Sequence, residues 1–306
     1  MVVENTLVSG RFRVGRKLGE GGGGQVYAVR DIHSGRNLAM KIQAPRLPFV
    51  RTGTYSQDGA ALVYEKEVGA ELSEVPGLVV AEEGAEFMGR HFFVMERIEG
   101  PLLAKFIEDR TPVDTPSIAA VLAQVCGTLA CMHERGYAHR DVKSENVSVE
   151  WSGRVRLLDV GFAEKLSNAH DFSPTGTPGY VAPELSSGKH FDERSDIFSA
   201  GCVLFEMAVM KLPYPHFSGH APVETEPFSP HDLDQMDPTL RQLGLAMIAW
   251  DPDHRPRRIP EVLAVLRSLL PKAEAPKPPR RRPPDPVRWL WAQDPDQTEA
   301  LPGRLP

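Results

Sequence analysis

Cysteine is scarce in this chain, with three residues among 306: Cys126, Cys131 and Cys202. The number is odd and no two form a CxxC pair, which argues against a disulfide framework and a zinc site. All three lie in apolar stretches that favour helices. We therefore expect buried, reduced thiols rather than ligands or cross-links.

Long apolar runs are also missing. No stretch approaches the ~18 uninterrupted apolar residues of a spanning helix. The first 13 residues include Glu4 and Arg11 and have no long apolar core, so we predict neither a membrane span nor a signal peptide.

Basic residues are not in surplus either. The formal net charge is -6, whereas a nucleic-acid reader normally carries an excess of Lys and Arg. The 41% hydrophobic and 25% charged residues are those of an ordinary globular protein. We expect a cytoplasmic protein without a nucleic-acid partner.

The first hundred residues favour strands separated by glycine-bearing turns. The expected strands cover residues 12–18, 25–31, 37–42, 78–83 and 91–97. A loop over 44–59 and one helix over about 60–75 interrupt this series.

From about Ser117 the pattern becomes helical, with Val121, Leu122, Val125, Leu129 and Met132 at helical spacing. Further helices are expected at 195–210, 237–249 and 260–270. The predicted fold class is α+β, with a small β-rich lobe (about 11–97, one main helix) and a larger helical lobe (about 98–270).

The remaining residues, 271–306, form a distinct segment in which 10 of 36 residues are proline. Such a composition predicts a largely extended tail. Its run PKPPRRRPPDP could also bind an SH3-like partner. Trp289 and Trp291 are unusual in an exposed tail, and they favour docking on the chain's own surface or on a partner.

A glycine-rich loop between two expected strands fits the spacing GxGxxGxV. Its residues are Gly19, Glu20, Gly21, Gly22, Gly23, Gly24, Gln25 and Val26. Backbone without side chains can approach phosphates closely. By itself this is a weak signal, since a flexible glycine turn has the same sequence.

Lys41 follows in an apolar strand, where it could either snorkel to solvent or aim its ammonium at phosphates. A carboxylate on the next helix would position it. Glu65 and Glu67 are both candidates. Glu65 fits the apolar positions at Val68 and Leu72, but the flanking residues favour Glu67, which is the predicted partner.

The catalytic-loop motif is the strongest signal. HRDVKSEN combines HRD with an asparagine five positions after the aspartate. Phosphoryl transfer needs a carboxylate that accepts the proton of the attacking hydroxyl, which suits Asp141, and an oxygen ligand for Mg²⁺, which suits Asn146. Lys143 can offset charge on the transferred group.

Asp159 follows at the end of the next expected strand, with Gly161 two residues later. An acidic residue near a glycine is a common turn. Placed after the catalytic loop, however, Asp159 is the natural carboxylate for Mg²⁺ on the β- and γ-phosphates.

Together these motifs resemble the eukaryotic-type serine/threonine protein kinase family over about residues 12–270. The resemblance implies a bilobal kinase fold, the cofactors ATP and Mg²⁺, and a protein substrate with a Ser or Thr acceptor. The nucleotide site it implies adds Leu18, Ala39, Met95, Glu96 and Ile98 to the glycine loop and Lys41.

The same resemblance assigns structural roles in the second half. Thr177 would hydrogen-bond near Asp141, Asp196 would hold the backbone of the catalytic loop, and Arg255 would pair with Glu184. Lys143 and Thr177 favour Ser/Thr over Tyr as acceptor. The activation segment suggests autophosphorylation at Thr175 first, then Ser173 or Ser167.

Two departures from the family pattern stand out. Val160 replaces the usual phenylalanine after the metal aspartate, which predicts a looser equilibrium between active and inactive states. Leu102 stands where many basophilic kinases carry an acid, so a preference for upstream arginine is not supported.

Two other functions share part of this pattern. A pseudokinase would keep the fold as a binding module, and only Val160 and the uncertain glutamate favour it. A small-molecule phosphotransferase would usually lack the Glu184 segment and its arginine partner.

Overall fold

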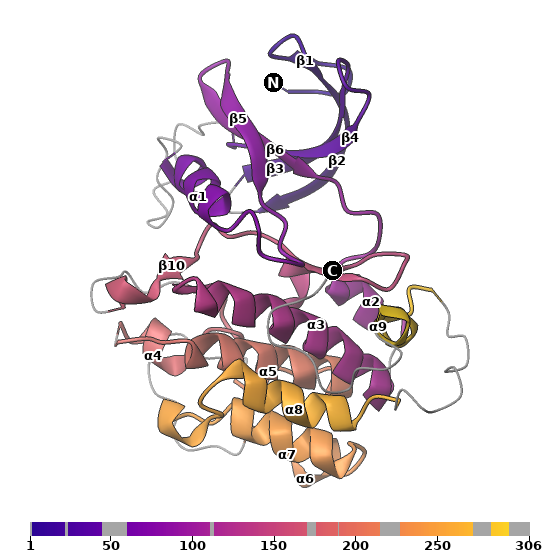
Figure 1. Ribbon diagram of the computed structural model, residues 1–306, viewed down its shortest axis with the longest axis vertical. Coiled ribbons are helices and arrows are strands. Elements are labelled where there is room, and N and C mark those ends of the chain that lie inside the picture. Colours follow the sequence, from indigo (N-terminus) through magenta and orange to yellow (C-terminus); the bar gives the residue numbers. More distant parts are fainter. Residues whose placement is uncertain are drawn as a thin grey trace. The chain divides into compact units, whose positions relative to one another are not determined.

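The computed structural model describes residues 2–21, 24–44, 60–110, 113–169, 176–188, 190–214, 227–271 and 283–293. The chain divides into two compact units (Figure 1). The first contains Met1–Glu74, Val79–Ile98 and Asp159–Gly161, and the second contains Val75–Leu78, Glu99–Leu158 and Phe162–Pro306.

The first unit is built on one six-stranded antiparallel sheet with strand order β1-β2-β3-β4-β6-β5. Its strands are β1 Leu7–Val8, β2 Phe12–Gly21, β3 Gly24–Asp31, β4 Asn37–Ile42, β5 Ala81–Phe87 and β6 Arg90–Glu96. Strands β3 and β4 are joined by a short turn over residues 32–36, as the glycine-bearing turns of the sequence predicted.

Alternation along β4 sorts its side chains onto two faces. Leu38, Met40 and Ile42 belong to a buried apolar cluster with residues of β2, β3 and β6. Ala39 and Lys41 therefore point to the opposite face. Helix α1 (Ala60–Glu71) contributes Glu65 to a contact with Lys41 on that face.

The second unit is mainly helical. Its helices of ten residues or more are α3 Thr115–Glu134, α5 Arg194–Val209, α7 Pro238–Met247 and α8 Ile259–Ser268. Helix α3 packs against α5 and α8 and is buried along most of its length (Figure 1). Asp114 caps its start by accepting the backbone N–H of Ser117 at 2.9 Å.

Helix α3 is also long and apolar enough to cross a membrane by length and composition alone, with a mean hydropathy of 1.5 over its best window. However, 78% of that window is buried inside the protein. A core helix passes the same test, so the composition of α3 is explained by packing.

Short strands and helical turns in the second unit position the loops. The hairpin β8 (Val147–Val149) and β9 (Val155–Leu157) follows the 3₁₀ turn η1 (Ser144–Asn146). Strands β7 (Tyr137–Ala138) and β10 (Glu164–Lys165) pair antiparallel.

The strand-rich first unit and the helical second unit confirm the predicted α+β class. The expectation of an extended tail is wrong for residues 286–293, which form helix α9 (Pro286–Gln293). The expected loop over 44–59 lies outside the described residues, apart from its first position.

Candidate active site

The β2–β3 hairpin carries the glycine-rich loop. Gly21 pairs with Gly24 across the hairpin, while Gly22 and Gly23 lie outside the described residues. Gly24 has φ +136°, and a Cβ there would lie 2.5 Å from the carbonyl oxygen of Ile42. Glycine is therefore required at Gly24 by both conformation and space.

The other residues nominated for nucleotide binding belong to the same unit. Ala39 on β4 lies opposite Met95 on β6, and Lys41 lies opposite Val26 on β3. Glu96 ends β6, and Ile98 is the last residue of this part of the unit. Leu18 on β2 is 42% exposed. The sheet register thus gathers these residues in the unit that holds the glycine loop.

Lys41 is buried and contacts two carboxylates. Its Nζ lies 2.6 Å from Oε2 of Glu65 and 2.9 Å from Oδ2 of Asp159. Side chains of Lys41 and Glu65 are 7% and 8% exposed, whereas that of Asp159 is 33% exposed. The lysine is therefore positioned by a buried carboxylate and reaches a second one that water can approach.

The prediction that Glu67 pairs with Lys41 is wrong, because Glu65 makes this contact and Glu67 is exposed. Residues two positions apart on a helix point in nearly opposite directions. The buried side of α1 contains Leu62, Glu65 and Val68, which is the spacing that had favoured Glu65 in the sequence.

The cluster of Lys41, Glu65 and Asp159 has two acidic groups and one basic group, and the pKa values of Lys41 and Glu65 are shifted. Burial lowers the pKa of Lys41, but the two carboxylates outweigh this and raise it above its usual range. Burial raises the pKa of Glu65, Asp159 raises it further and Lys41 opposes them, which leaves the pKa at about 8. One ammonium is thus shared between two carboxylates that repel each other.

Asp159 adopts a backbone conformation that is uncommon for a residue other than glycine, with φ 62°. Its Oδ1 accepts the backbone N–H of Gly161 at 3.1 Å. A Cβ at Gly161 would lie 3.0 Å from that oxygen, so glycine preserves this close turn. Val160 between them is 1% exposed and fills a buried position.

In the second unit, Asp141 is the centre of a compact hydrogen-bond network. Thr177 Oγ1 donates to Asp141 Oδ1 at 2.6 Å, and Asn146 Nδ2 donates to Oδ2 at 2.8 Å. Lys143 Nζ lies 2.8 Å from Oδ2 and 2.6 Å from Thr177 Oγ1. The contact that the resemblance implied for Thr177 is therefore present.

The loop that carries Asp141 is fixed by hydrogen bonds from its backbone to Asp196. This fully buried carboxylate accepts the backbone N–H groups of His139 and Arg140, each at 2.8 Å. Arg140 has φ 66°, a costly conformation that these bonds can maintain. The role predicted for Asp196 is confirmed by these contacts.

Sequence reasoning missed His133, which contacts the carboxylate of Asp196. Its Nε2 lies 2.8 Å from Asp196 Oδ2, and its Nδ1 lies 3.4 Å from Glu193 Oε2. Burial lowers the pKa of His133, but the contacts with Asp196 and Glu193 outweigh this and raise it to about 9. The raised pKa favours the imidazolium form of His133, which stabilises the buried carboxylate of Asp196.

A second group that sequence reasoning missed joins the catalytic loop to the activation segment. Ser144 Oγ donates to Glu206 Oε1 at 2.8 Å, and Tyr180 OH donates to Glu206 Oε2 at 2.7 Å. Burial raises the pKa of Glu206. Glu206, on α5, thus fixes two loops at once.

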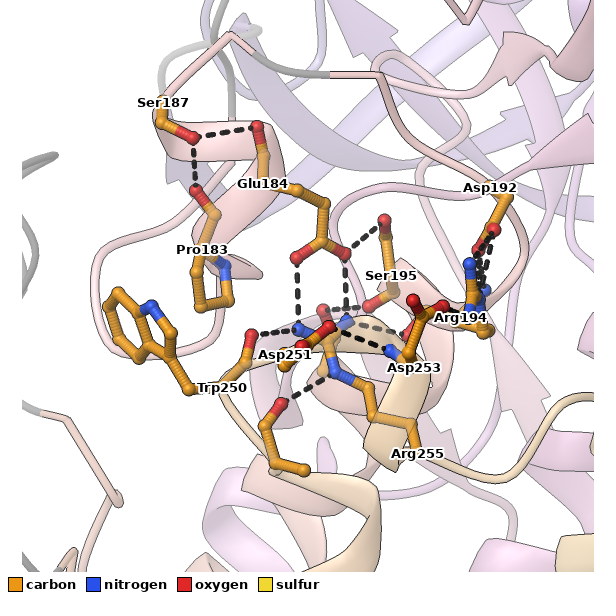
Figure 2. A network of polar contacts seen from close by, with 12 residues as sticks. Pro183, Glu184, Ser187, Asp192, Arg194, Ser195, Trp250, Asp251, Asp253 and Arg255 are labelled. Atoms are coloured by element: carbon orange, nitrogen blue, oxygen red, sulfur yellow. Dashed lines mark hydrogen bonds and ion pairs between the residues drawn. The ribbon is translucent and has the colours of Figure 1, made fainter.

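Glu184 and Arg255 form the predicted pair, and Figure 2 shows their surroundings. Arg255 donates from Nη1 and Nη2 to the two oxygens of Glu184 at 2.7 and 2.9 Å. Ser195 Oγ donates to Glu184 Oε1 at 2.7 Å, and Arg255 Nε donates to the carbonyl oxygen of Ala249 at 2.7 Å. A buried bidentate pair with further hydrogen bonds fixes the start of α4 (Pro183–Ser186).

The candidate phosphorylation sites are only partly covered. Ser167 is exposed in the turn η2 (Leu166–Asn168), whereas Ser173 and Thr175 lie outside the described residues.

The guanidinium of Arg140 lies 4.9 Å from the ring centroid of Phe191 and 3.9 Å from Glu164.

The two residues expected to hold magnesium, one in each unit, both offer oxygen donors. Asn146 uses its amide nitrogen for both hydrogen bonds to Asp141, which leaves its amide oxygen for a metal. Asp159 supplies carboxylate oxygen. Among the described residues no group of three or more His, Cys, Asp or Glu side chains could hold a metal. Amide and carboxylate oxygens are the kinds of ligand that Mg²⁺ takes beside substrate phosphates.

A β-rich unit with a buried lysine–glutamate pair and a helical unit with an HRD loop define the class of the protein kinases. The protein kinase domain family matches residues 12–265, so the chain belongs to this family. Its curated relatives carry the name serine/threonine-protein kinase, the family that the sequence resembles.

Three of these relatives are bacterial serine/threonine-protein kinases. PknL of Mycobacterium tuberculosis is 32% identical over 219 residues, which is 69% of this chain and 52% of PknL. A probable serine/threonine-protein kinase of Corynebacterium efficiens is 28% identical over 286 residues, 86% of this chain and 42% of the relative. PknB of Mycobacterium leprae is 28% identical over 277 residues, 85% of this chain and 43% of PknB.

The chain thus spans about half the length of the curated relatives it matches.

Proposed function

We propose that this chain transfers the γ-phosphoryl group of ATP to Ser or Thr hydroxyls of protein substrates. The observation that carries the proposal is the network around Asp141. A carboxylate that would accept a proton is held by Thr177 and Asn146, with the ammonium of Lys143 beside it.

Each residue has a role that suits its contacts. Asp141 orients the acceptor hydroxyl and takes its proton, and Lys143 stabilises charge on the transferred group. Lys41, positioned by Glu65, binds the phosphates, and the glycine loop covers them. Asn146 and Asp159 would hold magnesium, which would supply positive charge to balance the phosphates.

A protein acceptor is favoured by the Glu184–Arg255 pair. This pair fixes the end of the activation segment, on which a peptide substrate can dock. Thr177 and Lys143, which contact each other at 2.6 Å, favour Ser or Thr as the acceptor.

Further proposals concern the setting of the reaction. The activation segment is autophosphorylated, at Thr175 before Ser173 or Ser167. The protein works in the cytoplasm without a nucleic-acid partner. The proline-rich run before residue 287 binds either an SH3-like partner or the chain itself.

The test is a transfer assay with labelled ATP, Mg²⁺ and a generic protein substrate, run beside Asp141→Asn. We expect labelled substrate with the wild-type chain and loss of label with the variant. Binding of Mg-ATP by both proteins, measured by thermal shift, separates loss of chemistry from loss of nucleotide.

The alternative is a pseudokinase, favoured by the small buried Val160 in place of phenylalanine. In that case both proteins would bind nucleotide and neither would transfer phosphate. Mass spectrometry of the chain incubated with ATP tests autophosphorylation, and absence of phosphate between residues 159 and 177 would contradict it.

A further inference from the structure

Helix α9 (Pro286–Gln293) lies beyond the part of the chain that matches the kinase domain, which ends at residue 265. It is not a free tail. Val287 is 1% exposed, Asp285 is 7% exposed, and α9 packs against α3 (Figure 1). Asp285 Oδ1 accepts the backbone N–H of Arg288 at 3.1 Å, so the start of the helix is capped where it is buried.

The other surface in this contact is the turn between β8 and β9. Gly153 in that turn has φ +97°, and a Cβ there would lie 2.2 Å from the carbonyl oxygen of Asp285 and 2.9 Å from Cβ of Trp289. Any side chain at Gly153 would therefore displace α9. The absence of a side chain on the turn is what lets the helix approach.

A hollow of about 520 Å³ lies along the edge of this contact. The residues that line it come from the turn and from the tail: Trp151, Ser152, Pro283, Asp285, Arg288, Trp289 and Ala292. Trp151 is 60% exposed on the side of the hollow. Tail and turn thus form one continuous surface with two tryptophans.

The turn is also tied to the rest of the second unit. Gln124 of α3 is buried; its Nε2 donates to the carbonyl oxygen of Gly153 at 3.3 Å and its Oε1 accepts the N–H of Val155 at 2.9 Å. The N–H of Trp151 donates to the carbonyl oxygen of Glu99 at 3.0 Å. Helix α9 therefore covers a turn whose hydrogen bonds reach α3 and the segment that enters the second unit.

We propose that residues 284–293 are a docking element that binds in cis to the β8–β9 turn and α3 and holds this turn in place. The docked segment belongs to this chain: it has a buried face and a capped start, and a glycine lies opposite it. The β8–β9 hairpin follows Asn146 and precedes Asp159. If the proposed function holds, the docked tail also steadies the segment that carries Asn146.

Cross-linking tests the contact in the full-length chain. Cys126, Cys131 and Cys202 are buried free thiols, and burial raises the pKa of Cys126 to about 12, so they react poorly with maleimides. In the double variant Ser152→Cys/Ala292→Cys, a short bismaleimide should join the two new thiols within one chain. Adding Val287→Asp should abolish most of this product.

An intramolecular product whose yield is unchanged by Val287→Asp would contradict docking through the buried face of α9. A product that is mainly a covalent dimer, and that grows with protein concentration, would show that the tail binds a second copy and would overturn the proposal in cis.

Amide hydrogen exchange tests the effect on the turn without any activity readout. The amides of Trp151, Gly153 and Val155 all donate hydrogen bonds within or next to the turn. Val287→Asp should speed their exchange about tenfold or more, because local opening no longer requires undocking of α9. Gln293→Asp adds the same charge at an exposed position of the same helix and should leave the exchange of these amides unchanged.

Faster exchange in both variants, or in neither, would overturn the proposal. Exchange in α5 serves as an internal reference, because a variant that loosens the whole unit would speed it there too. Failure of the transfer assay with intact turn protection would count against the proposed function and not against the docking.

Discussion

The two clusters of candidate catalytic residues differ in how their charges are balanced. In the first unit, one ammonium, Lys41, is shared by the carboxylates of Glu65 and Asp159. In the second unit, one carboxylate, Asp141, is surrounded by three donors from Thr177, Asn146 and Lys143. The first cluster therefore has more acidic groups than its one ammonium can balance, and burial together with Asp159 raises the pKa of Glu65 to about 8. In the second cluster Lys143 balances the single carboxylate.

This difference suits two tasks. An excess of carboxylate beside a lysine favours the arrival of a divalent cation with a phosphate chain, which supplies the missing positive charge and a partner for the ammonium. A carboxylate fixed by preformed donors needs little rearrangement before it orients a hydroxyl. Disturbing the first cluster should mainly change nucleotide binding, and disturbing the second should mainly change turnover.

The largest effect is expected for Asp141→Asn. Loss of the base should lower kcat by roughly 10²- to 10⁴-fold, while the dissociation constant of Mg-ATP changes little. The matched change in the other cluster, Asp159→Asn, should instead weaken Mg-ATP binding. Steady-state kinetics measure turnover and calorimetric titration measures Mg-ATP affinity in each variant. An equal loss of Mg-ATP affinity in both variants would contradict the proposed division between the two clusters.

The next effect concerns the glutamate that positions Lys41. Glu65→Gln removes a buried charge-assisted hydrogen bond that is worth about 1.5–3 kcal/mol, so kcat/KM for ATP should fall roughly 10- to 150-fold. Glu67→Gln, on the exposed side of the same helix, is the control. Equal kinetics for the two variants would mean that the Lys41–Glu65 pair does not act in nucleotide binding.

A smaller effect is expected for Thr177→Val, which removes one of the three donors to Asp141. Lys143 and Asn146 still hold the carboxylate, so kcat should fall only about tenfold, the lower end for a hydrogen bond to a charged group. Thr177→Ser keeps the hydroxyl and should restore most of the rate. A serine variant as slow as the valine variant would assign the effect to packing of the methyl group.

The smallest effect is a pH dependence of stability from His133, behind Asp196. The pKa of His133 is about 9 in the folded chain, above the ordinary value of 6.5. The folded state therefore binds this proton more tightly than the unfolded state. The stabilisation is complete below pH 6.5 and is lost as pH rises towards 9, by at most about 1.4 kcal/mol per pH unit.

Urea unfolding at several pH values measures this slope, with His133→Gln as the reference. The difference between the two proteins should shrink between pH 6.5 and 9. A constant difference would show that His133 is neutral beside Asp196.

The candidate site could be predicted from the sequence wherever a local pattern of residues indicates it. Alternation placed Lys41 away from the apolar face of β4, and the spacing of the HRD motif identified Asp141 and Asn146. The choice between Glu65 and Glu67 failed because flanking residues were given more weight than the helical spacing of Val68 and Leu72, which indicates the buried side of α1.

Other features have no local pattern. His133 and Asp196 are 63 residues apart, and Ser144 and Glu206 are 62 apart, so only the fold shows that they meet. The extended conformation predicted for residues 286–293 was wrong for a different reason. Its proline content describes the segment as a whole, whereas α9 depends on a short stretch that begins with Asp285 as cap and Pro286 at its first turn.

The close approach of Gly24 to the end of β4 has a practical consequence for mutagenesis of the phosphate loop. A methyl group at this position meets the backbone of Ile42 rather than any ligand. Gly24→Ala would therefore push β3 away from β4 at the residue next to Lys41. Weakened nucleotide affinity in such a variant would report a displaced lysine, even though the altered residue had never touched a phosphate.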